Sequence, residues 1–350
     1  MKKILYISNI EVPYRVRFFN ELAKHCELTV LYERERSSNR NSDWTKSVCR
    51  SYRIKYLHGI KVSRENSFSL GILKEIFSGY DRIIVGCYNS PVQMMMILAL
   101  RLCRKKYIVN LDGEPFLDGS GLKAKLKRFF LRGAAAYLAA GEKAAASLRS
   151  YVNKPVVAYP FSSLTKQELE ANRAAAANCR RDDTVLVVGQ YFDYKGMDVA
   201  LEAARLDHSL HYQFVGMGGR TELFRQEQQV PGNVELIPFL QKQELEQAYQ
   251  SCAMLVLPSR QECWGLVVNE AASFGTPIVS TWGSGAAVEF LGENYPQYLA
   301  RPGDGADLLR CIRQCRDDRG TEAYSRFLLE KSKDHHIENN VQACLEALSR

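Results

Sequence analysis

Two glutamates, Glu262 and Glu270, stand at the two edges of the nearly apolar segment "ECWGLVVNE". Carboxylates are costly to bury without partners, so their positions need a reason. The preceding run "AMLVLPS" is typical of a buried strand, and "GLVVNEAASF" has helical periodicity. Glu262 is therefore expected in the loop at the carboxyl end of a strand, and Glu270 is expected inside the helix that follows.

The backbone N–H groups of Trp264, Gly265 and Leu266 lie between these glutamates, at the expected start of that helix. A helix N-terminus favours anions, and glycine allows close backbone approach. Two carboxylates on either side of a phosphate site fit a ligand with hydroxyl-rich groups at both ends, such as a nucleotide-sugar. The alternative, that both glutamates are ordinary surface charges, is not excluded by spacing alone.

Three further motifs precede this one in order: "VVGQYFDYKGMDVALEAARL", "FVGMGG" and "NVELIPFLQKQELEQAYQSCAMLVLPS". Together with "ECWGLVVNEAASFGTPIVST", they resemble the retaining glycosyltransferases of family 4, which have the GT-B fold. The resemblance covers most of residues 180–310. The N-terminal half resembles the family only in its general pattern.

The resemblance implies roles for particular residues. Glu270 would hold ribose hydroxyls, Glu262 would hold hydroxyls of the transferred sugar, and Lys195 would neutralise the diphosphate. Phe239 would border the base. The expected donor-binding set is Gly189, Gln190, Lys195, Gly216, Gly218, Arg220, Phe239, Ser259, Glu262, Trp264, Gly265, Leu266 and Glu270.

The sequence departs from the family pattern at two places. Gln190 stands where the family usually has arginine, and a glutamine carries no charge. Either Lys195 and the helix amides suffice for the diphosphate, or Arg220 assists. The first loop, "SNIEVPYRVRFF", lacks the family's Gly-Gly, and its Asn9, Tyr14 and Arg15 are candidates for the acceptor side.

Asp112 and Glu114, in "NLDGEPFLDG", follow a predicted strand of the N-terminal half. Either carboxylate could orient an acceptor hydroxyl, and we count both with Glu262 and Lys195 as candidate catalytic residues. The alternative is that they are turn residues bonded to local backbone N–H groups.

No metal or other cofactor is expected. The chain has no Asp-x-Asp at a strand end and no histidine cluster, so Lys195 and the helix N-terminus would stabilise the departing diphosphate. The resemblance implies retention of configuration by front-face attack. The nucleotide-sugar is a substrate.

Short apolar runs alternate with helical segments along the chain, which predicts α/β architecture. The interruption "KPVVAYPFSSLT" divides this pattern into two Rossmann-like lobes with parallel sheets. We predict an acceptor lobe over residues 1–160, a donor lobe over 161–331, and a return helix at about 332–350 that crosses back to the first lobe.

The composition is that of a globular protein, with a net charge of +8 that suits an anionic ligand or membrane surface. The start "MKKILYISN" loses its apolar character too soon for a signal peptide. The ten cysteines show no zinc or disulfide spacing. We therefore expect a cytoplasmic protein with reduced, mostly buried thiols and no nucleic-acid partner.

The segment 121–132, "GLKAKLKRFFLR", combines an apolar stripe with five basic residues. It could lie on the inner face of an anionic membrane and bring the protein to a glycan acceptor carried on a polyprenyl-diphosphate lipid. It could equally pack its apolar stripe on its own sheet, as any surface helix does.

The sequence thus predicts a hexosyltransferase that uses a UDP- or GDP-linked sugar in bacterial capsule, O-antigen or exopolysaccharide assembly. Two alternatives remain, a nucleotide-sugar epimerase or hydrolase on the same fold and a non-catalytic nucleotide-sugar-binding subunit. A dinucleotide dehydrogenase is poorly supported, because no Gly-x-Gly-x-x-Gly follows the first strand.

Overall fold

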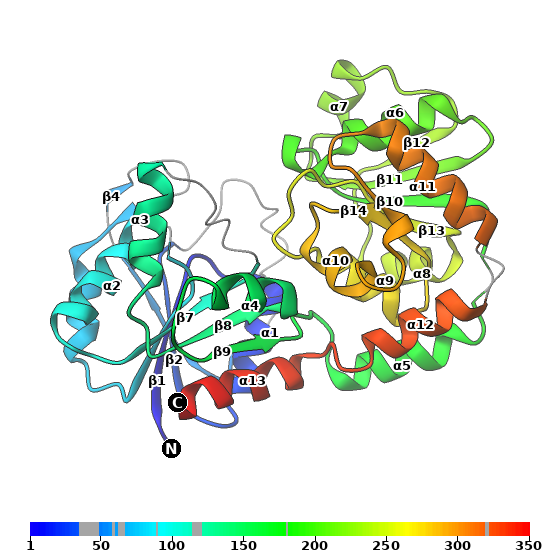
Figure 1. The fold of residues 1–350 in the computed structure, drawn as a ribbon. Helices are drawn as coiled ribbons and strands as arrows, with labels where there is room; N and C mark the ends of the chain where they lie inside the picture. The colour runs from blue at the N-terminus through cyan, green and yellow to red at the C-terminus, as the bar shows by residue number, and fades with distance from the viewer. Residues whose placement is uncertain are drawn as a thin grey trace. The chain divides into compact units, whose positions relative to one another are not determined.

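The computed structural model describes residues 1–34, 49–57, 60–61, 67–88, 90–113, 121–179, 181–318 and 322–350 (Figure 1). The chain forms two compact units. The first comprises Met1–Ser163 with Ile337–Arg350, and the second comprises Leu164–His336. The divisions lie close to the predicted ones, after residue 160 and at about residue 332.

A seven-stranded sheet with the order β3-β2-β1-β6-β7-β8-β9 forms the centre of the first unit, and all its pairings are parallel. Helices alternate with the strands, which is why β7 and β8 are wholly buried. The strands are β1 (Lys3–Ser8), β2 (Glu27–Tyr32), β3 (Arg53–Tyr56), β6 (Arg82–Val85), β7 (Tyr107–Leu111), β8 (Ala136–Ala140) and β9 (Val156–Tyr159).

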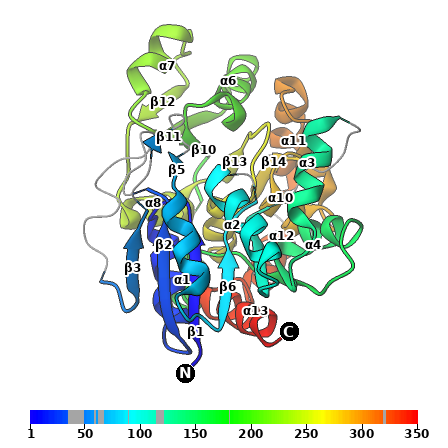
Figure 2. The same cartoon turned by 90° about the vertical axis from the view of Figure 1, so that its left-hand side faces the viewer.

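The remaining elements of the first unit lie between these strands and at the end of the chain. They are α1 (Pro13–Leu22), the two-stranded pair β4 (Ile60–Lys61) and β5 (Ser67–Phe68), the 3₁₀ helix η2 (Leu70–Phe77), α2 (Pro91–Leu102), α3 (Leu122–Leu131), α4 (Gly141–Arg149) and α13 (Ile337–Ser349). The last helix packs against α1 and β9, so the predicted return of the chain is confirmed (Figure 1). Figure 2 shows both termini of the chain at the lower end of the view.

The second unit has a six-stranded parallel sheet with the order β12-β11-β10-β13-β14-β15. Its strands are β10 (Thr184–Gln190), β11 (His211–Met217), β12 (Val234–Ile237), β13 (Met254–Leu257), β14 (Ile278–Thr281) and β15 (Leu299–Ala300). Its helices are α5 (Lys166–Ala176), η3 (Asp193–Lys195), α6 (Met197–Leu206), α7 (Thr221–Glu227), α8 (Lys242–Ser251), α9 (Leu266–Ser273), α10 (Gly285–Leu291), η4 (Pro296–Tyr298), α11 (Gly305–Asp318) and α12 (Glu322–Ser332).

The prediction of two Rossmann-like lobes is therefore confirmed. In the second sheet the strand order reverses between β10 and β13. Ligands of open parallel sheets bind outside the carboxyl ends of the strands at such a reversal. The fold therefore predicts a ligand-binding site at the loops after β10 and β13.

None of the helices in the described ranges combines the length and apolar character needed to cross a membrane. All ten cysteines are free thiols, of which Cys49, Cys103 and Cys263 are exposed. Lys3–Ser8, which opens the chain, is a largely buried strand.

Gly196 allows the loop after β10 to lie directly against the loop after β13. It ends η3 and precedes α6 with φ at 67°, in the left-handed region. A Cβ at this position would lie 2.0 Å from the carbonyl oxygen of Pro258. Only glycine therefore satisfies both the backbone conformation and the close approach.

We predict that Gly196→Ala destabilises the protein by at least about 3 kcal/mol, because strain in the left-handed conformation adds to a clash with backbone. Gly219→Ala is the matched control, since Gly219 has φ at 76° but open space around its Cβ position. The control should cost only about 1–2 kcal/mol. Chemical denaturation of both variants measures the difference, and equal costs would contradict the close approach.

Candidate functional site

Lys195 and Glu262 form an ion pair at the strand-order reversal of the second unit. Lys195 ends η3 after β10, and Glu262 lies in the loop after β13. The two side chains are only 19% and 15% exposed. Two residues that are distant in the sequence thus meet because their strands are neighbours in the sheet.

Arg260 holds the two loops together. Its backbone N–H donates to the carbonyl of Tyr194 at 2.9 Å, and its guanidinium donates to the Asp193 carbonyl at 2.8 Å. The same guanidinium contacts both carboxylate oxygens of Asp198 at 2.8 and 2.6 Å. These hydrogen bonds from Arg260 lower the pKa of Asp198 below its usual value. The position of Lys195 is therefore fixed by a second, adjacent pair of charges.

Glu262 is fixed from its other side by the loop after β14. Its backbone N–H donates to the Gly283 carbonyl at 2.8 Å, and its carbonyl accepts from the Gly285 N–H at 3.1 Å. Glu262 and Ser284 form a parallel bridge. The backbone of Glu262 is thus held as an extension of the sheet.

Gly265 turns the chain from this loop into α9. Its φ is 104°, and Leu266 opens the helix, as predicted. Trp264 is buried and donates its indole N–H to Asn269 at 2.8 Å. Ser259 is fully buried, and its hydroxyl oxygen has no hydrogen-bond partner in the part of the chain that the structure describes.

Glu270 lies on α9 with its carboxylate held by a buried tyrosine. Tyr249 of α8 donates its hydroxyl to Glu270 Oε2 at 3.0 Å. Burial, together with the neighbouring Glu270 charge, raises the pKa of Tyr249 well above its usual value, so the hydroxyl stays a donor. Glu270 is half-buried, which leaves part of it accessible to solvent.

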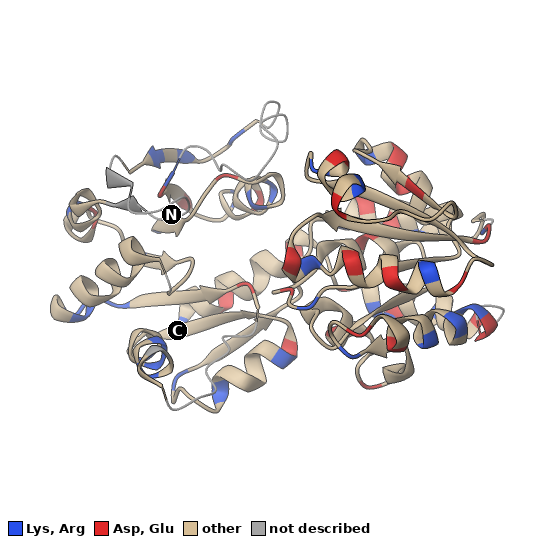
Figure 3. Ribbon diagram, turned by 90° about the horizontal axis from the view of Figure 1, so that it is seen from above, with Lys and Arg blue, Asp and Glu red and all other residues tan. Residues whose placement is uncertain are grey.

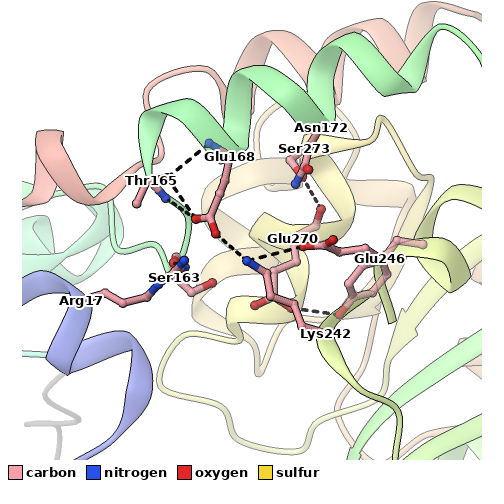
Figure 4. A network of polar contacts seen from close by, with 10 residues as sticks. Arg17, Ser163, Thr165, Glu168, Asn172, Lys242, Glu246, Glu270 and Ser273 are labelled. Atoms are coloured by element: carbon pink, nitrogen blue, oxygen red, sulfur yellow. Dashed lines mark hydrogen bonds and ion pairs between the residues drawn. The ribbon is translucent and has the colours of Figure 1, made fainter. Parts of the chain in front are cut away.

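A chain of charges lies beside Glu270 at the ends of α5 and α8 (Figure 4). Thr165 and Glu168 form a capping box at the start of α5. Glu168 accepts a hydrogen bond from Lys242 at 2.5 Å, and Glu246 lies 3.6 Å from the same lysine. Helices α5 and α8 both pack on α9, so this network braces the helix that carries Glu270.

The other predicted donor residues lie at the carboxyl ends of β10, β11 and β12. Gly218 lies close to the Gln190 side chain, since a Cβ there would be 3.1 Å from Gln190 Nε2. Arg220 is exposed, with its guanidinium 4.4 Å from the centre of the Phe192 ring. Phe239, after β12, is 44% exposed. Gly189 and Gly216 are paired one residue before the ends of β10 and β11.

In the first unit, Asp112 follows β7 and forms an ion pair with Arg15 of α1. Asn110 and Tyr159 also donate to Asp112, at 2.8 and 2.9 Å. All three donors contact Oδ1, which leaves Oδ2 without a partner among the described residues. Arg15 is 5% exposed, so its place is beneath Asp112 rather than on the surface.

Helix α2 connects the residues that follow β1 and β2 through the side chain of Gln93. Asn9 accepts a hydrogen bond from Gln93 at 2.7 Å, and Gln93 also donates to the buried Glu33 at 2.6 Å. Burial raises the pKa of Glu33 despite these hydrogen bonds. Tyr14 packs edge-on against Phe161. Glu114 lies outside the described residues.

The residues that hold the predicted site residues in position were not recognised in the sequence. Arg260 and Asp198 hold Lys195, Tyr249 holds Glu270, and Asn110 with Tyr159 holds Asp112. Asp198 and Arg260 lie within three residues of Lys195 and Glu262 in the sequence, so their charges could have been recognised as possible supports of these residues. Nothing in the pattern distinguishes Tyr249 from the other buried tyrosines. No cluster of three or more His, Cys, Asp or Glu side chains suited to a metal ion is found among the described residues.

Comparisons with known proteins bear on the unit that holds this site. Residues 170–334 match the family model of glycosyl transferases group 1. This group 1 segment spans most of the second unit and includes Lys195, Glu262 and Glu270.

Curated relatives match over short ranges. Glycogen synthase of Thermus thermophilus is 33% identical over 105 residues, which are 29% of this chain and 24% of the relative. Sulfoquinovosyl transferase of Arabidopsis thaliana is 39% identical over 84 residues, which are 23% of this chain and 16% of the relative. The matches thus span about a quarter or less of these two relatives.

Solved structures match over the whole chain. Sucrose-phosphate synthase from Thermosynechococcus elongatus has a TM-score of 0.71 at 16% identity and covers 100% of this chain and 98% of its own. Anabaena HepE in complex with UDP has a TM-score of 0.70 at 15% identity, with full coverage of both chains. The chain therefore has the GT-B fold, as predicted.

We predict that a double-mutant cycle with Lys195→Met and Glu262→Gln gives a coupling energy of about 1–3 kcal/mol, because the pair is largely shielded from water. The exposed pair Arg149–Glu142, with side chains 45% and 59% exposed, is the control. Its cycle with Arg149→Met and Glu142→Gln should stay below about 1 kcal/mol. Urea unfolding of the variants measures both, and a negligible Lys195–Glu262 coupling would contradict the pairing.

Proposed function

We propose that the protein transfers a hexose from a UDP- or GDP-linked sugar to a glycan acceptor in bacterial surface polysaccharide assembly, with retention of configuration. The observation that carries the proposal is the Lys195–Glu262 pair at the strand-order reversal, followed directly by the N-terminus of α9. Lys195 and the backbone amides at the start of α9 would bind the diphosphate of the donor. Glu262 and Glu270, on either side of them, would bind the hydroxyl groups of its two sugars.

The comparisons support the class of reaction. The group 1 segment contains Lys195, Glu262 and Glu270, the predicted lysine and carboxylates of the donor site. Anabaena HepE, which shares the fold, has been solved with UDP and with UDP-glucose. The two curated relatives named above are a synthase of glycogen and a sulfoquinovosyl transferase.

In the proposed reaction, the bond between the anomeric carbon and the diphosphate oxygen breaks as the bond to the acceptor oxygen forms on the same face. The acceptor proton passes to the departing phosphate. Lys195 and the amides of Gly265 and Leu266 offset the charge that develops on the diphosphate. Glu262 holds sugar hydroxyls, and Glu270, supported by Tyr249, holds the ribose.

This chemistry needs no metal ion in our proposal, because the lysine and the helix N-terminus supply the positive charge. Gln190 takes the place of the usual arginine as an uncharged hydrogen-bond donor, and Arg220, which lies over the Phe192 ring, supplies a further cation. Addition of a chelator should therefore leave transfer unchanged.

Asp112 is the acceptor-side residue that the geometry favours. Arg15, Asn110 and Tyr159 all bind its Oδ1, so the carboxylate is oriented while Oδ2 remains for an acceptor hydroxyl. Arg15 then acts as a positioning residue. We propose a glycan on a polyprenyl-diphosphate lipid as the acceptor.

A non-catalytic nucleotide-sugar-binding subunit is the second candidate, and Gln190 is the feature that favours it. Both candidates predict donor binding. Only a transferase gives a glycosylated product that depends on an added acceptor, whereas an epimerase or hydrolase changes the nucleotide-sugar alone. Product analysis with and without a lipid-linked glycan separates the three.

We predict that at least one UDP- or GDP-sugar raises the thermal unfolding midpoint of the protein, since a ligand that binds only the folded state stabilises it. Glu270→Ala and Lys195→Ala should each reduce the shift by at least half. Lys166→Ala, an exposed lysine of the same unit, is the control and should retain the full shift. A wild-type protein that no nucleotide-sugar stabilises would overturn the donor-site assignment.

We also predict opposite effects of Glu262→Gln on two ligands. The substitution frees Lys195 from its ion pair, so UDP without a sugar should bind several-fold more tightly. A UDP-sugar loses a hydroxyl acceptor, so its rate of transfer should fall at least tenfold. Calorimetry and product assays test the two parts, with the exposed Glu227→Gln as control. Weaker binding of UDP by the Glu262 variant would contradict the proposed competition.

A further inference from the structure

The apolar stripe of α3 is turned largely to solvent. Leu122, Leu126 and Phe129 are 82%, 47% and 47% exposed, and of the predicted stripe only Phe130 is buried. The sequence left open whether this stripe packs on its own sheet. The structure shows that most of it does not.

The end of α2 adds a second apolar group beside α3, which it contacts. Leu98 and Leu102 are 38% and 85% exposed. Two neighbouring helices therefore present large apolar side chains together. A contiguous apolar surface rimmed by polar groups is typical of an interaction site.

Basic residues outnumber acidic ones in the two segments that carry these apolar side chains. No Asp or Glu occurs in residues 82–111 or 119–141, although the chain has 39 of them. Arg104, Lys105 and Lys106 extend the basic character beyond α2, and all three are exposed. Figure 3 shows the Lys and Arg of the whole chain in blue and its Asp and Glu in red. We call the exposed residues of 98–106 and 121–132 the basic apolar surface.

A hollow of about 380 Å³ lies within this surface, lined by Arg101, Lys125, Arg128, Phe129 and Arg132. Arg101 is fixed there, with its guanidinium 4.5 Å from the centre of the Phe129 ring and a hydrogen bond of 3.0 Å to the Phe129 carbonyl. Four cations around one hollow, with no carboxylate among its lining residues, favour an anion such as a phosphate group.

We propose that the basic apolar surface docks on an anionic phospholipid bilayer, with a headgroup phosphate in the Arg101–Lys125–Arg128–Arg132 hollow. Leucine and phenylalanine side chains enter the region between headgroups and acyl chains, and the cations bind lipid phosphates. Charge complementarity favours a bilayer over a second copy of the chain, because this surface offers no acidic residues to meet its own cations.

The docking surface lies wholly in the first unit and does not depend on the donor chemistry. It deepens the proposed function in one respect, since a membrane-bound protein reaches an acceptor that is carried on a lipid. The failure of either proposal leaves the other standing, because vesicle binding and nucleotide-sugar binding are measured separately.

The test is co-sedimentation of the full chain with vesicles of phosphatidylcholine alone or with added phosphatidylglycerol. We expect binding only to the anionic vesicles, weakened by salt. The double variant Lys125→Gln/Arg128→Gln should bind about ten- to thirtyfold more weakly. The variant Arg225→Gln/Arg326→Gln, which removes the same charge from exposed helices of the second unit, should bind as the wild type does.

Leu126→Ser/Phe129→Ser tests the apolar component separately and should also weaken binding, with circular dichroism and thermal unfolding confirming that the variants fold. If Lys125→Gln/Arg128→Gln and Arg225→Gln/Arg326→Gln lost vesicle binding equally, net charge alone would explain the binding, and the proposal would be overturned. Vesicle binding that none of the α3 variants changes would also overturn it. Self-association or capture of an acidic protein through this surface, without vesicle binding, would assign it to a protein partner instead.

Discussion

The ion pair between Lys195 and Glu262 is the interaction on which the candidate site depends. Removing two charges from water costs free energy, and the pair recovers this cost only when its geometry is held. The surrounding loops supply that geometry through the Arg260–Asp198 pair, the bridge between Glu262 and Ser284, and the approach of Gly196 to Pro258. The proposed exchange of this internal ion pair for a charged ligand needs such rigidity, because the ligand would replace a partner in a position that is already set.

In the first unit, a single carboxylate, that of Asp112, is held in a fixed orientation by its neighbours. Asp112 is held by Arg15, Asn110 and Tyr159 on a single oxygen, so its second oxygen keeps a defined direction and has no partner among the residues that the structure describes. Both units thus place an oriented carboxylate at the carboxyl ends of parallel strands. In each case the orienting groups are buried and come from elements distant in the sequence, which is how a packed scaffold fixes a side chain more accurately than a loop can.

The charges of the basic apolar surface are arranged differently. Lys195 and Arg260 are matched with carboxylates at short range, whereas the described lining of the hollow beside Phe129 includes four cations and no carboxylate. Matched charges fix a structure, and like charges that gather around exposed leucines repel one another unless an anionic partner is present. In our proposal, the same residue types therefore fix positions in the second unit and recognise an anionic surface in the first.

The sequence by itself determined the two parallel-sheet lobes, the helix that begins at Leu266 and ends before Gly275, and the return of the last helix. These follow from short-range patterns of apolar residues, glycine and proline, which act within a few residues of the chain. Only the tertiary structure decided that Lys195 pairs with Glu262, that Arg15 lies buried beneath Asp112, that Tyr249 supports Glu270, and that the stripe of α3 faces solvent. Each of these depends on which strands and helices become neighbours, and strand order is set by the packing of the whole sheet rather than by any local segment.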